Sequence, residues 1–391
     1  MIDNFKYIYK LFPKNVWNLT LLQLLYVLRV TFFTTSRKVG DYTVAVNTSS
    51  VLVVAVILLS IVIISKEFRY CKNAHRVIGK LFVFYFLCFA SLLWAGFHAV
   101  IVFKVLENIC NLYIMYIIAS KIRDVRLLLI YIIVLSTIMS YIDICNSIMR
   151  LGFGFHHTNS YSMSSMIAFL LGIQAKKYKV LPPKILNWLL FFNFIAIIGG
   201  TSSATYIASI VGLVLVYSST KRGVNIKKLI VVSLLAICIY YMFSDSIQGF
   251  VFQGKTQENI VSGSGRDAIF KAAINSWKAH PLLGSGYIVG ERDLGRYGLG
   301  INVLSTHNSF LSVLVDTGLV GMAPFLYFLI SWLVCLVKKS KDNVFATMLV
   351  PVFIALIINC LSYPAIGADW CYVSSIIFLM YIMTNFYIKR C

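Results

Sequence analysis

Two residues suited to holding an anion and moving a proton frame one polar stretch of this otherwise apolar chain. Arg266 stands near the start of that stretch, and its guanidinium can donate paired hydrogen bonds to a phosphate. His307 stands at the end of the stretch, just before a long apolar run. An imidazole that is partly shielded from water at the edge of a membrane can accept a proton near neutral pH. The pair predicts anion binding combined with general-base chemistry.

Each of these residues also has a purely structural interpretation. Arg266, in the first turn of a predicted helix, strengthens the positive potential that attracts an anion, but an Arg at a membrane surface also contacts lipid phosphate. His307 and Asn308 can simply cap the apolar helix that follows. The residues alone leave both interpretations open.

A second polar cluster, RLGFGFHHTNS, carries Arg150, His156, His157 and Asn159. Two adjacent His could suggest a metal ion, but neighbouring residues are not arranged to share one ion, and no carboxylate or Cys lies close by in the sequence. We therefore predict no metal site and no cofactor. The cluster falls on the same predicted side of the membrane as Arg266 and His307.

The segment GSGYIVG, residues 284–290, is superficially similar to a phosphate-binding glycine loop. It follows a helix that Pro281 ends, whereas a nucleotide-binding loop follows a strand. We therefore reject a nucleotide site. In GTSSATYIAS, residues 200–209, the small residues favour tight helix packing, with a substrate-lining role second.

The composition predicts an all-α integral membrane protein. Hydrophobic residues make up 59% of the chain and charged residues only 13%, against about 25% in a typical soluble domain. Apolar runs are long enough to cross a hydrocarbon core of about 30 Å as helices. Twelve spans are predicted in a single transmembrane domain over 1–391: 16–34, 44–64, 81–102, 105–120, 127–147, 161–175, 185–200, 202–219, 229–247, 309–337, 344–362 and 371–388. The first span is weakly apolar, and the tenth is expected to bend at Pro324.

The distribution of basic residues predicts the orientation. Of the 35 Lys and Arg residues, 24 fall in connections and termini on one side, which is therefore the cytoplasmic side. Both termini are predicted to be cytoplasmic. Most of the net charge of +21 is thus a topology signal, and the alternation of basic residues with spans argues against nucleic acid.

A large extracytoplasmic loop, residues 248–308, follows between the ninth and tenth spans. Such a long connection is expected to carry internal structure and function. Ser264 can cap a helix from about 265 to 279, which Pro281 would end. Its apolar residues follow a spacing of three and four, which is typical of an amphipathic helix lying on a membrane surface. Trp277 lies in its last turn.

Neither the N-terminus nor the cysteines suggest processing or cross-linking. MIDNFKYIYKLFPKNVWNLT lacks a short apolar core with a cleavage site, so we expect no removable signal peptide. The nine Cys show no metal or disulfide spacing, and most lie within apolar runs.

Taken together, the motifs resemble the O-antigen ligase and polymerase superfamily. SGRDAIFKAAINSWKAHPLLGSG, followed by THNSFLSVLVDTGLVG, is similar to its signature, and RLGFGFHHTNSYSMSSMIAFLLG is similar to its upstream motif. The resemblance covers roughly residues 150–325; residues before 120 contribute only topology.

The resemblance implies a family C type glycosyltransferase of the bacterial plasma membrane. Such enzymes transfer a glycan from undecaprenyl pyrophosphate to a sugar hydroxyl on the outer face, without metal or nucleotide sugar. Arg266 would hold the donor pyrophosphate, and His307 would accept the proton of the acceptor hydroxyl, which inverts the anomeric carbon. The predicted substrate-binding residues are Arg150, His157, Asn159, Trp277 and Asn308.

One departure from the family pattern concerns Ala204, which follows Ser203 where ligase relatives commonly carry an Arg. Either that phosphate contact is missing, or Arg150 or another outward cation supplies it. The leading hypothesis is therefore a polymerase of O-antigen, capsule or exopolysaccharide repeat units. A ligase that transfers polymer to lipid A core is the first alternative.

A flippase or transporter of the same lipid-linked sugar is the alternative from another class. It would place charges deep in its spans, whereas the candidate residues here cluster at the outer edge. Intramembrane charges are few: Arg29, Asp143, Asp245 and Asp316. A non-enzymatic polysaccharide-binding assembly factor is a further alternative. The expected partners are lipid-linked repeat units and membrane lipids, with a chain-length regulator and a flippase of the same pathway.

Overall fold

The computed structural model describes residues 12–32, 48–152, 158–220, 223–224, 227, 230–231, 266–297 and 305–388. These residues are mostly α-helical, as predicted, apart from the antiparallel pair β1 (Ser219–Thr220) and β2 (Gly223–Val224). The longer helices are α2 (Lys14–Phe32), α3 (Thr48–Lys66), α5 (Ala74–Ala90), α6 (His98–Lys121), α7 (Val125–Leu151), α8 (Asn159–Lys177), α9 (Pro183–Gly199), α10 (Ser203–Ser218), α14 (Arg266–Ala279), α16 (Ser309–Lys339), α17 (Val344–Cys360) and α18 (Tyr372–Met383). Short turns are α4 (Phe68–Cys71), η1 (Ser91–Leu93), α15 (Val289–Arg292), η3 (Leu294–Tyr297) and the π-helical η4 (Thr384–Ile388).

Described helices overlap every predicted span except the ninth, 229–247, which lies almost entirely outside the described residues. Within the described ranges, four helical segments are long and apolar enough to cross a membrane: Ala74–Leu93, His98–Lys121, Val125–Arg150 and Ser309–Lys339. Five shorter apolar helices accompany them. The chain is therefore compatible with a polytopic membrane protein, and the count of twelve spans stays a prediction.

Helix starts follow local capping chemistry. The side chain of Asn343 accepts hydrogen bonds from the backbone of Phe345 and Ala346 at the start of α17, and Asp124 accepts from Arg126 at the start of α7. Short polar side chains at this position satisfy backbone N–H groups that have no partner within the helix. These boundaries therefore need no tertiary contact.

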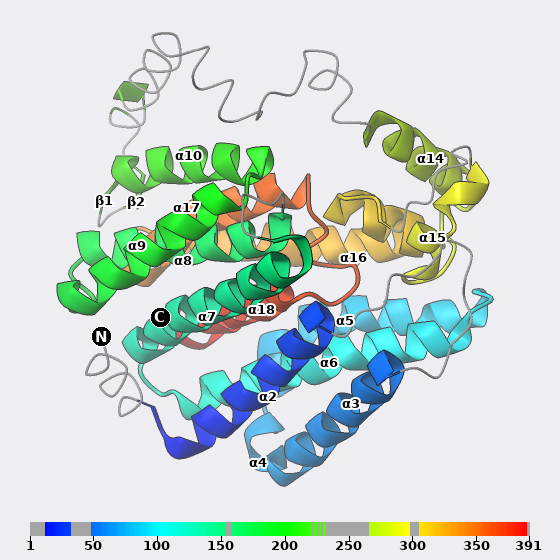
Figure 1. The fold of residues 1–391 in the computed structure, drawn as a ribbon, viewed down its shortest axis with the longest axis horizontal. Helices are drawn as coiled ribbons and strands as arrows, with labels where there is room; N and C mark the ends of the chain where they lie inside the picture. The colour runs from blue at the N-terminus through cyan, green and yellow to red at the C-terminus, as the bar shows by residue number, and fades with distance from the viewer. Residues whose placement is uncertain are drawn as a thin grey trace.

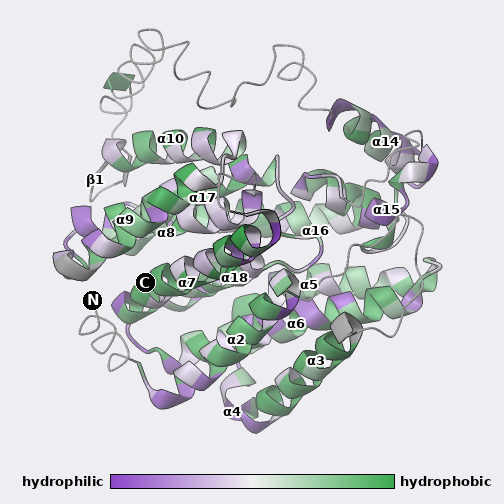
Figure 2. Ribbon diagram, viewed as in Figure 1, coloured by the Kyte–Doolittle hydropathy of each residue, from purple (hydrophilic) through white to green (hydrophobic). Residues whose placement is uncertain are grey.

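The predicted outward loop and a predicted cytoplasmic turn lie at opposite ends of the molecule. Figure 1 shows α14 and α15 at the right-hand end of the helix bundle and the β1–β2 turn at the left. Hydrophobic residues run along the bundle helices, and hydrophilic residues lie on α14 and α15 and at other helix ends (Figure 2). The orientation of the chain in the membrane stays a prediction.

The connection between α5 and α6 lies earlier than predicted. The expected break fell between residues 102 and 105, but the structure breaks the helix at 94–97. The loop after α14 docks at this point: the backbone N–H of Tyr287 donates to Ser91 Oγ at 3.0 Å, and a Cβ on Gly286 would lie 2.3 Å from the Cβ of Ala95. A tertiary contact thus sets this boundary.

The break in α16 lies earlier than Pro324, where a bend was predicted. The backbone of α16 leaves helical geometry at Gly318, where φ is 58° and ψ is −160°. Gly tolerates this left-handed conformation because it has no Cβ. Pro324 lies inside the helical segment that follows.

The loop after α14 fills the break in α16. The N–H groups of Leu319 and Val320 donate to the carbonyls of Pro281 and Leu282, both at 3.0 Å. In return, the N–H groups of Ser285 and Gly286 donate to the carbonyls of Val315 and Asp316, at 3.0 and 2.9 Å. We call this exchange of four backbone hydrogen bonds the interlock. It ties the loop after α14 to the middle of α16.

The carboxylate of Asp316 extends the interlock to α15. It is fully buried and accepts the backbone N–H groups of Ile288, at 2.8 Å, and Glu291, at 2.9 Å. A buried carboxylate is tolerated when such hydrogen bonds satisfy it. The intramembrane charge noted at Asp316 therefore holds the fold of the outer loop.

We expect Gly318→Ala to destabilise the protein by about 1–3 kcal/mol, because the new Cβ is disfavoured at positive φ. That Cβ would also lie 2.3 Å from the carbonyl oxygen of Leu282, within the interlock. Thermal unfolding in detergent measures the effect. Gly79→Ala is the matched control, since a Cβ there meets no atom within 4 Å. Equal melting temperatures for the two variants would contradict the role of the interlock.

Candidate functional site

Arg266 is the first residue of α14, as predicted. Its side chain is partly buried, and this burial lowers the pKa of the guanidinium, which nevertheless stays protonated at neutral pH. Within the described part of the chain, no Asp or Glu forms an ion pair with it. A partly dry cation at a helix N-terminus is suited to an anion.

His307 lies directly before α16, also as predicted. Its backbone φ is 53°, in the left-handed region that few residues other than Gly occupy. Its N–H donates to Ser305 Oγ at 3.1 Å, and Asn308 begins the helix cap. The surrounding contacts hold this turn in a strained conformation, which is common at functional sites.

Glu291 holds the turn that carries His307. Its carboxylate accepts the backbone N–H and the hydroxyl of Thr306, both at 3.0 Å, and the hydroxyl of Ser312. The side chain is buried, which raises the pKa of its carboxyl group, while these hydrogen bonds favour the ionised form. Sequence reasoning missed Glu291, because an acidic residue 15 positions before its partner gives no local signal.

Asn308 serves as the N-cap of α16. Its side-chain oxygen accepts the N–H groups of Phe310 and Leu311 at 2.9 and 3.1 Å, and its amide donates to the carbonyl of Leu361 at 3.1 Å. The capping interpretation is therefore correct for this residue. Its predicted contact with substrate stays a prediction.

The upstream motif lies beside the connection between α17 and α18. Asn159 accepts a hydrogen bond from Ser202 at 2.7 Å, so it faces the segment between α9 and α10. Ser160 donates to Asp143 at 2.5 Å, and Tyr372 donates to the same oxygen at 2.7 Å. Tyr372 begins α18, directly after that connection.

The turn that carries His307 contacts the same connection. Asn308 donates to Leu361, and Ser309 Oγ donates to the carbonyl of Tyr363 at 3.3 Å. Residues 361–372 thus link Ser160 and Asp143 to the start of α16. The structure brings the upstream motif and the His307 turn to one connection, although they are far apart in sequence.

The remaining predicted residues lie apart from this connection or outside the described residues. Arg150 is exposed near the end of α7, and His157 lies outside the described residues. Trp277 is near the opposite end of α14 from Arg266, where its indole N–H donates to the carbonyl of Pro281 at 3.1 Å. Their substrate-binding roles stay predictions.

The segment between α9 and α10 packs tightly, as predicted. The carbonyl of Gly200 accepts the N–H of Thr158 at 3.1 Å, and a Cβ on Gly200 would lie 2.5 Å from the Cβ of Ser162. Only a residue without a side chain permits this approach. The small residues here therefore bring the start of α8 against the start of α10.

A buried ionic cluster, which the sequence analysis also missed, joins the N-terminal helices to the outer loop. Arg29 of α2 pairs with Glu107 of α6, which also pairs with Lys104 at 3.1 Å. Lys104 reaches Asp369 at 2.6 Å, and Arg292 lies 3.9 Å from the same carboxylate. Residues before 120 therefore contribute more than topology.

Among the described residues, no group of three or more His, Cys, Asp or Glu is placed to hold a metal ion. No disulfide joins the described Cys residues.

Residues 188–326 match the Wzy_C family model, described as O-Antigen ligase. This match over part of the chain is consistent with the O-antigen ligase and polymerase superfamily that the sequence resembles. The match contains Arg266, Trp277, His307 and Asn308, whereas the upstream motif lies before it. No curated protein matches the chain. With its apolar helices, the match indicates a membrane protein of polysaccharide biosynthesis with glycosyltransferase-like activity.

We expect Glu291→Ala to lower the free energy of unfolding by about 1–3 kcal/mol, because it leaves the buried backbone N–H of Thr306 without its acceptor. The hydroxyls of Thr306 and Ser312 still donate to the carbonyl of Asn308. Glu291→Gln keeps one acceptor oxygen and should cost less. Thermal unfolding of both variants in detergent checks the order. An Ala variant as stable as the wild type would show that Glu291 does not hold the turn.

Proposed function

We propose that this protein is a polysaccharide polymerase of the bacterial plasma membrane. It would transfer a growing glycan from undecaprenyl pyrophosphate to a sugar hydroxyl of another lipid-linked repeat unit, on the outer face. The observation that carries the proposal is the match to the O-antigen ligase model, which contains both Arg266 and His307. Both residues also lie in or beside the loop predicted to face outward.

The proposed chemistry needs a stabilised leaving group and a base. The bond between the anomeric carbon and the pyrophosphate oxygen breaks, and the departing diphosphate keeps the electron pair. Arg266 would stabilise that negative charge as it develops. The acceptor hydroxyl attacks from the opposite side and gives its proton to His307, so that the anomeric configuration inverts.

The arrangement around His307 supports its role as the base. A general base must be held within hydrogen-bond reach of the proton it removes, so its backbone has to be fixed. Glu291 fixes Thr306 on one side of His307, and the Asn308 cap fixes the other.

A ligase is the second candidate, because the matched family is described as O-Antigen ligase. Ala204 stands where ligase relatives commonly carry a phosphate-binding Arg, which favours the polymerase. Arg150, exposed near the end of α7, could supply that cation. For a polymerase and for a ligase alike, both termini would be cytoplasmic. A flippase and a chain-length regulator of the same pathway would be partners.

Replacing Arg266 or His307 with Ala should abolish polymer while leaving the protein folded. Loss of a positioned general base costs about 10²–10⁴-fold in rate. Electrophoresis of glycans from cells expressing each variant should show single repeat units. Lys271→Ala is the matched control, because Lys271 is exposed on the same helix as Arg266. Long polymer from both site variants would refute the assignment.

Deletion of the chain separates the two candidates. Cells without a polymerase should carry lipid A core capped with one repeat unit, or an undecaprenyl lipid with a single unit. Cells without a ligase should accumulate long polymer on the undecaprenyl lipid. Analysis of the lipid-linked glycans by mass spectrometry distinguishes these results.

A further inference from the structure

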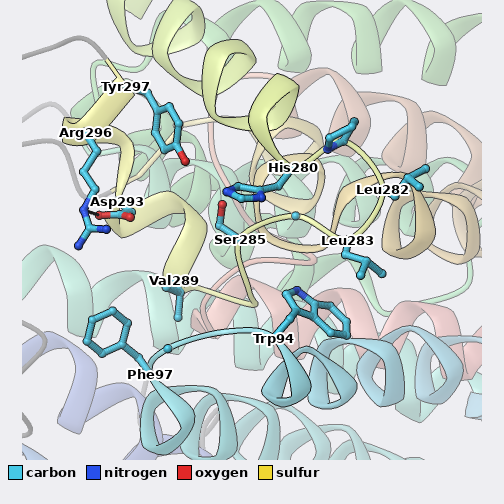
Figure 3. Close-up of a pocket in the computed structure, with 13 residues that line it drawn as sticks. Trp94, Phe97, His280, Leu282, Leu283, Ser285, Val289, Asp293, Arg296 and Tyr297 are labelled. Atoms are coloured by element: carbon cyan, nitrogen blue, oxygen red, sulfur yellow. Dashed lines mark ion pairs between the residues drawn. The ribbon is translucent and has the colours of Figure 1, made fainter.

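A cavity of about 650 Å³ lies between the loop after α14 and the connection from α5 to α6. Figure 3 shows Trp94 and Phe97 on one side, His280 and Ser285 on another, and Asp293 with Arg296 and Tyr297 on a third. Neither Arg266 nor His307 lines it. Its volume is within the range of about 300–1,000 Å³ that small-molecule sites occupy.

The three walls of this cavity are fixed to one another. The interlock holds residues 281–286 against α16, and Asp316 holds the start of α15 through the N–H groups of Ile288 and Glu291. The N–H of Tyr287 ties the same loop to Ser91 of η1. A site whose walls are already in place binds without the cost of ordering them.

The lining combines aromatic faces with hydrogen-bonding groups. Trp94 is 37% exposed at the cavity, and Phe97 and Tyr297 add two more rings. The Ser285 hydroxyl is buried and has no hydrogen-bond partner among the described residues. In Figure 3 it points toward His280.

The charges in the lining balance. Asp293 pairs with Arg296 at 2.7 Å, and the Arg296 side chain remains 69% exposed. This differs from the N-terminus of α14, where Arg266 has no ion-paired carboxylate among the described residues. A diphosphate would favour an excess of cations. The paired charges, the hydroxyls and the rings instead suit an uncharged ligand with many hydroxyl groups and apolar C–H faces, which is the chemistry of a pyranose.

The cavity and the His307 turn lie on opposite faces of α15. Val289 and Asp293, four residues apart, line the cavity, and Glu291 between them holds Thr306. One helical turn with its side chains, about 10 Å across, therefore separates the cavity from the candidate base. A sugar in the cavity would lie near the reacting sugar but would not itself react.

We propose that this cavity is a saccharide subsite that binds a non-reacting sugar of one glycan substrate. The inference rests on the proposed function for the identity of that glycan. Binding energy from non-reacting sugars can position the reacting centre. The subsite belongs either to the donor glycan or to the acceptor repeat unit, which present the same pyranose chemistry.

A binding experiment tests the subsite without requiring activity. The probe is the free repeat-unit oligosaccharide, released by mild acid from lipid-linked precursors of cells that lack this chain. The full-length protein in nanodiscs is titrated by calorimetry. Trp94→Ala removes a ring on which a sugar can stack, and Asp293→Ala removes a charged hydrogen-bond partner. Each change should weaken binding about tenfold. Trp94→Phe keeps a ring and should restore most of the affinity.

Two further variants separate binding in the cavity from binding elsewhere. His307→Ala should bind the oligosaccharide as the wild type does, because the residue lies across α15 from the cavity. Lys271→Ala, outside the cavity, should also leave binding unchanged. Melting temperatures confirm that each variant is folded. Wild-type affinity in folded Trp94→Ala and Asp293→Ala variants would overturn the proposal.

Kinetics assign the subsite to one substrate and separate this proposal from the proposed function. In a polymerisation assay with purified lipid-linked repeats, the cavity variants should raise KM about tenfold for either the donor or the acceptor, with a smaller change in kcat. Unchanged KM for both substrates, with activity still lost in Arg266→Ala and His307→Ala, would refute the subsite alone. Full activity in those two variants would refute the proposed function instead.

Discussion

The interlock between the loop after α14 and the break at Gly318 is the constraint on which the outer part of this structure depends. A helix broken within an apolar bundle leaves backbone groups without partners, and each such group costs several kcal/mol if nothing satisfies it. Here the carbonyls of Pro281 and Leu282 accept the N–H groups that α16 leaves unpaired. The loop and the broken helix therefore form together.

The functional arrangement follows from this constraint in steps. The interlock places Asp316 beneath α15, Asp316 fixes the N–H of Glu291, and Glu291 fixes the turn that carries His307. The cavity uses the opposite face of the same short helix. A single scaffold thus supports the candidate base and the proposed sugar subsite. Arg266 lies at the other end of α14 from the cavity, about 20 Å away along the helix axis.

The buried ionic cluster joins the two halves of the chain. Removing charges from water is costly, and their mutual attraction offsets the cost only with close pairing. The chain from Arg29 through Glu107 and Lys104 to Asp369 provides that pairing, and Arg292 connects it to α15. The N-terminal helices thus support the loop, although the family match begins only at residue 188.

The sequence by itself determined the helical membrane class, the helix that begins at Arg266 and ends before Pro281, and the candidate pair Arg266 and His307. These features depend on local hydropathy, capping and motif order, which are readable along the chain. Only the tertiary structure decided that α16 breaks at Gly318, that Glu291 holds the His307 turn, and that Arg29 pairs with Glu107, 78 residues away. Each of these features depends on groups that are distant in sequence and meet only when the helices pack. The local sequence around a polar side chain does not indicate such a partner.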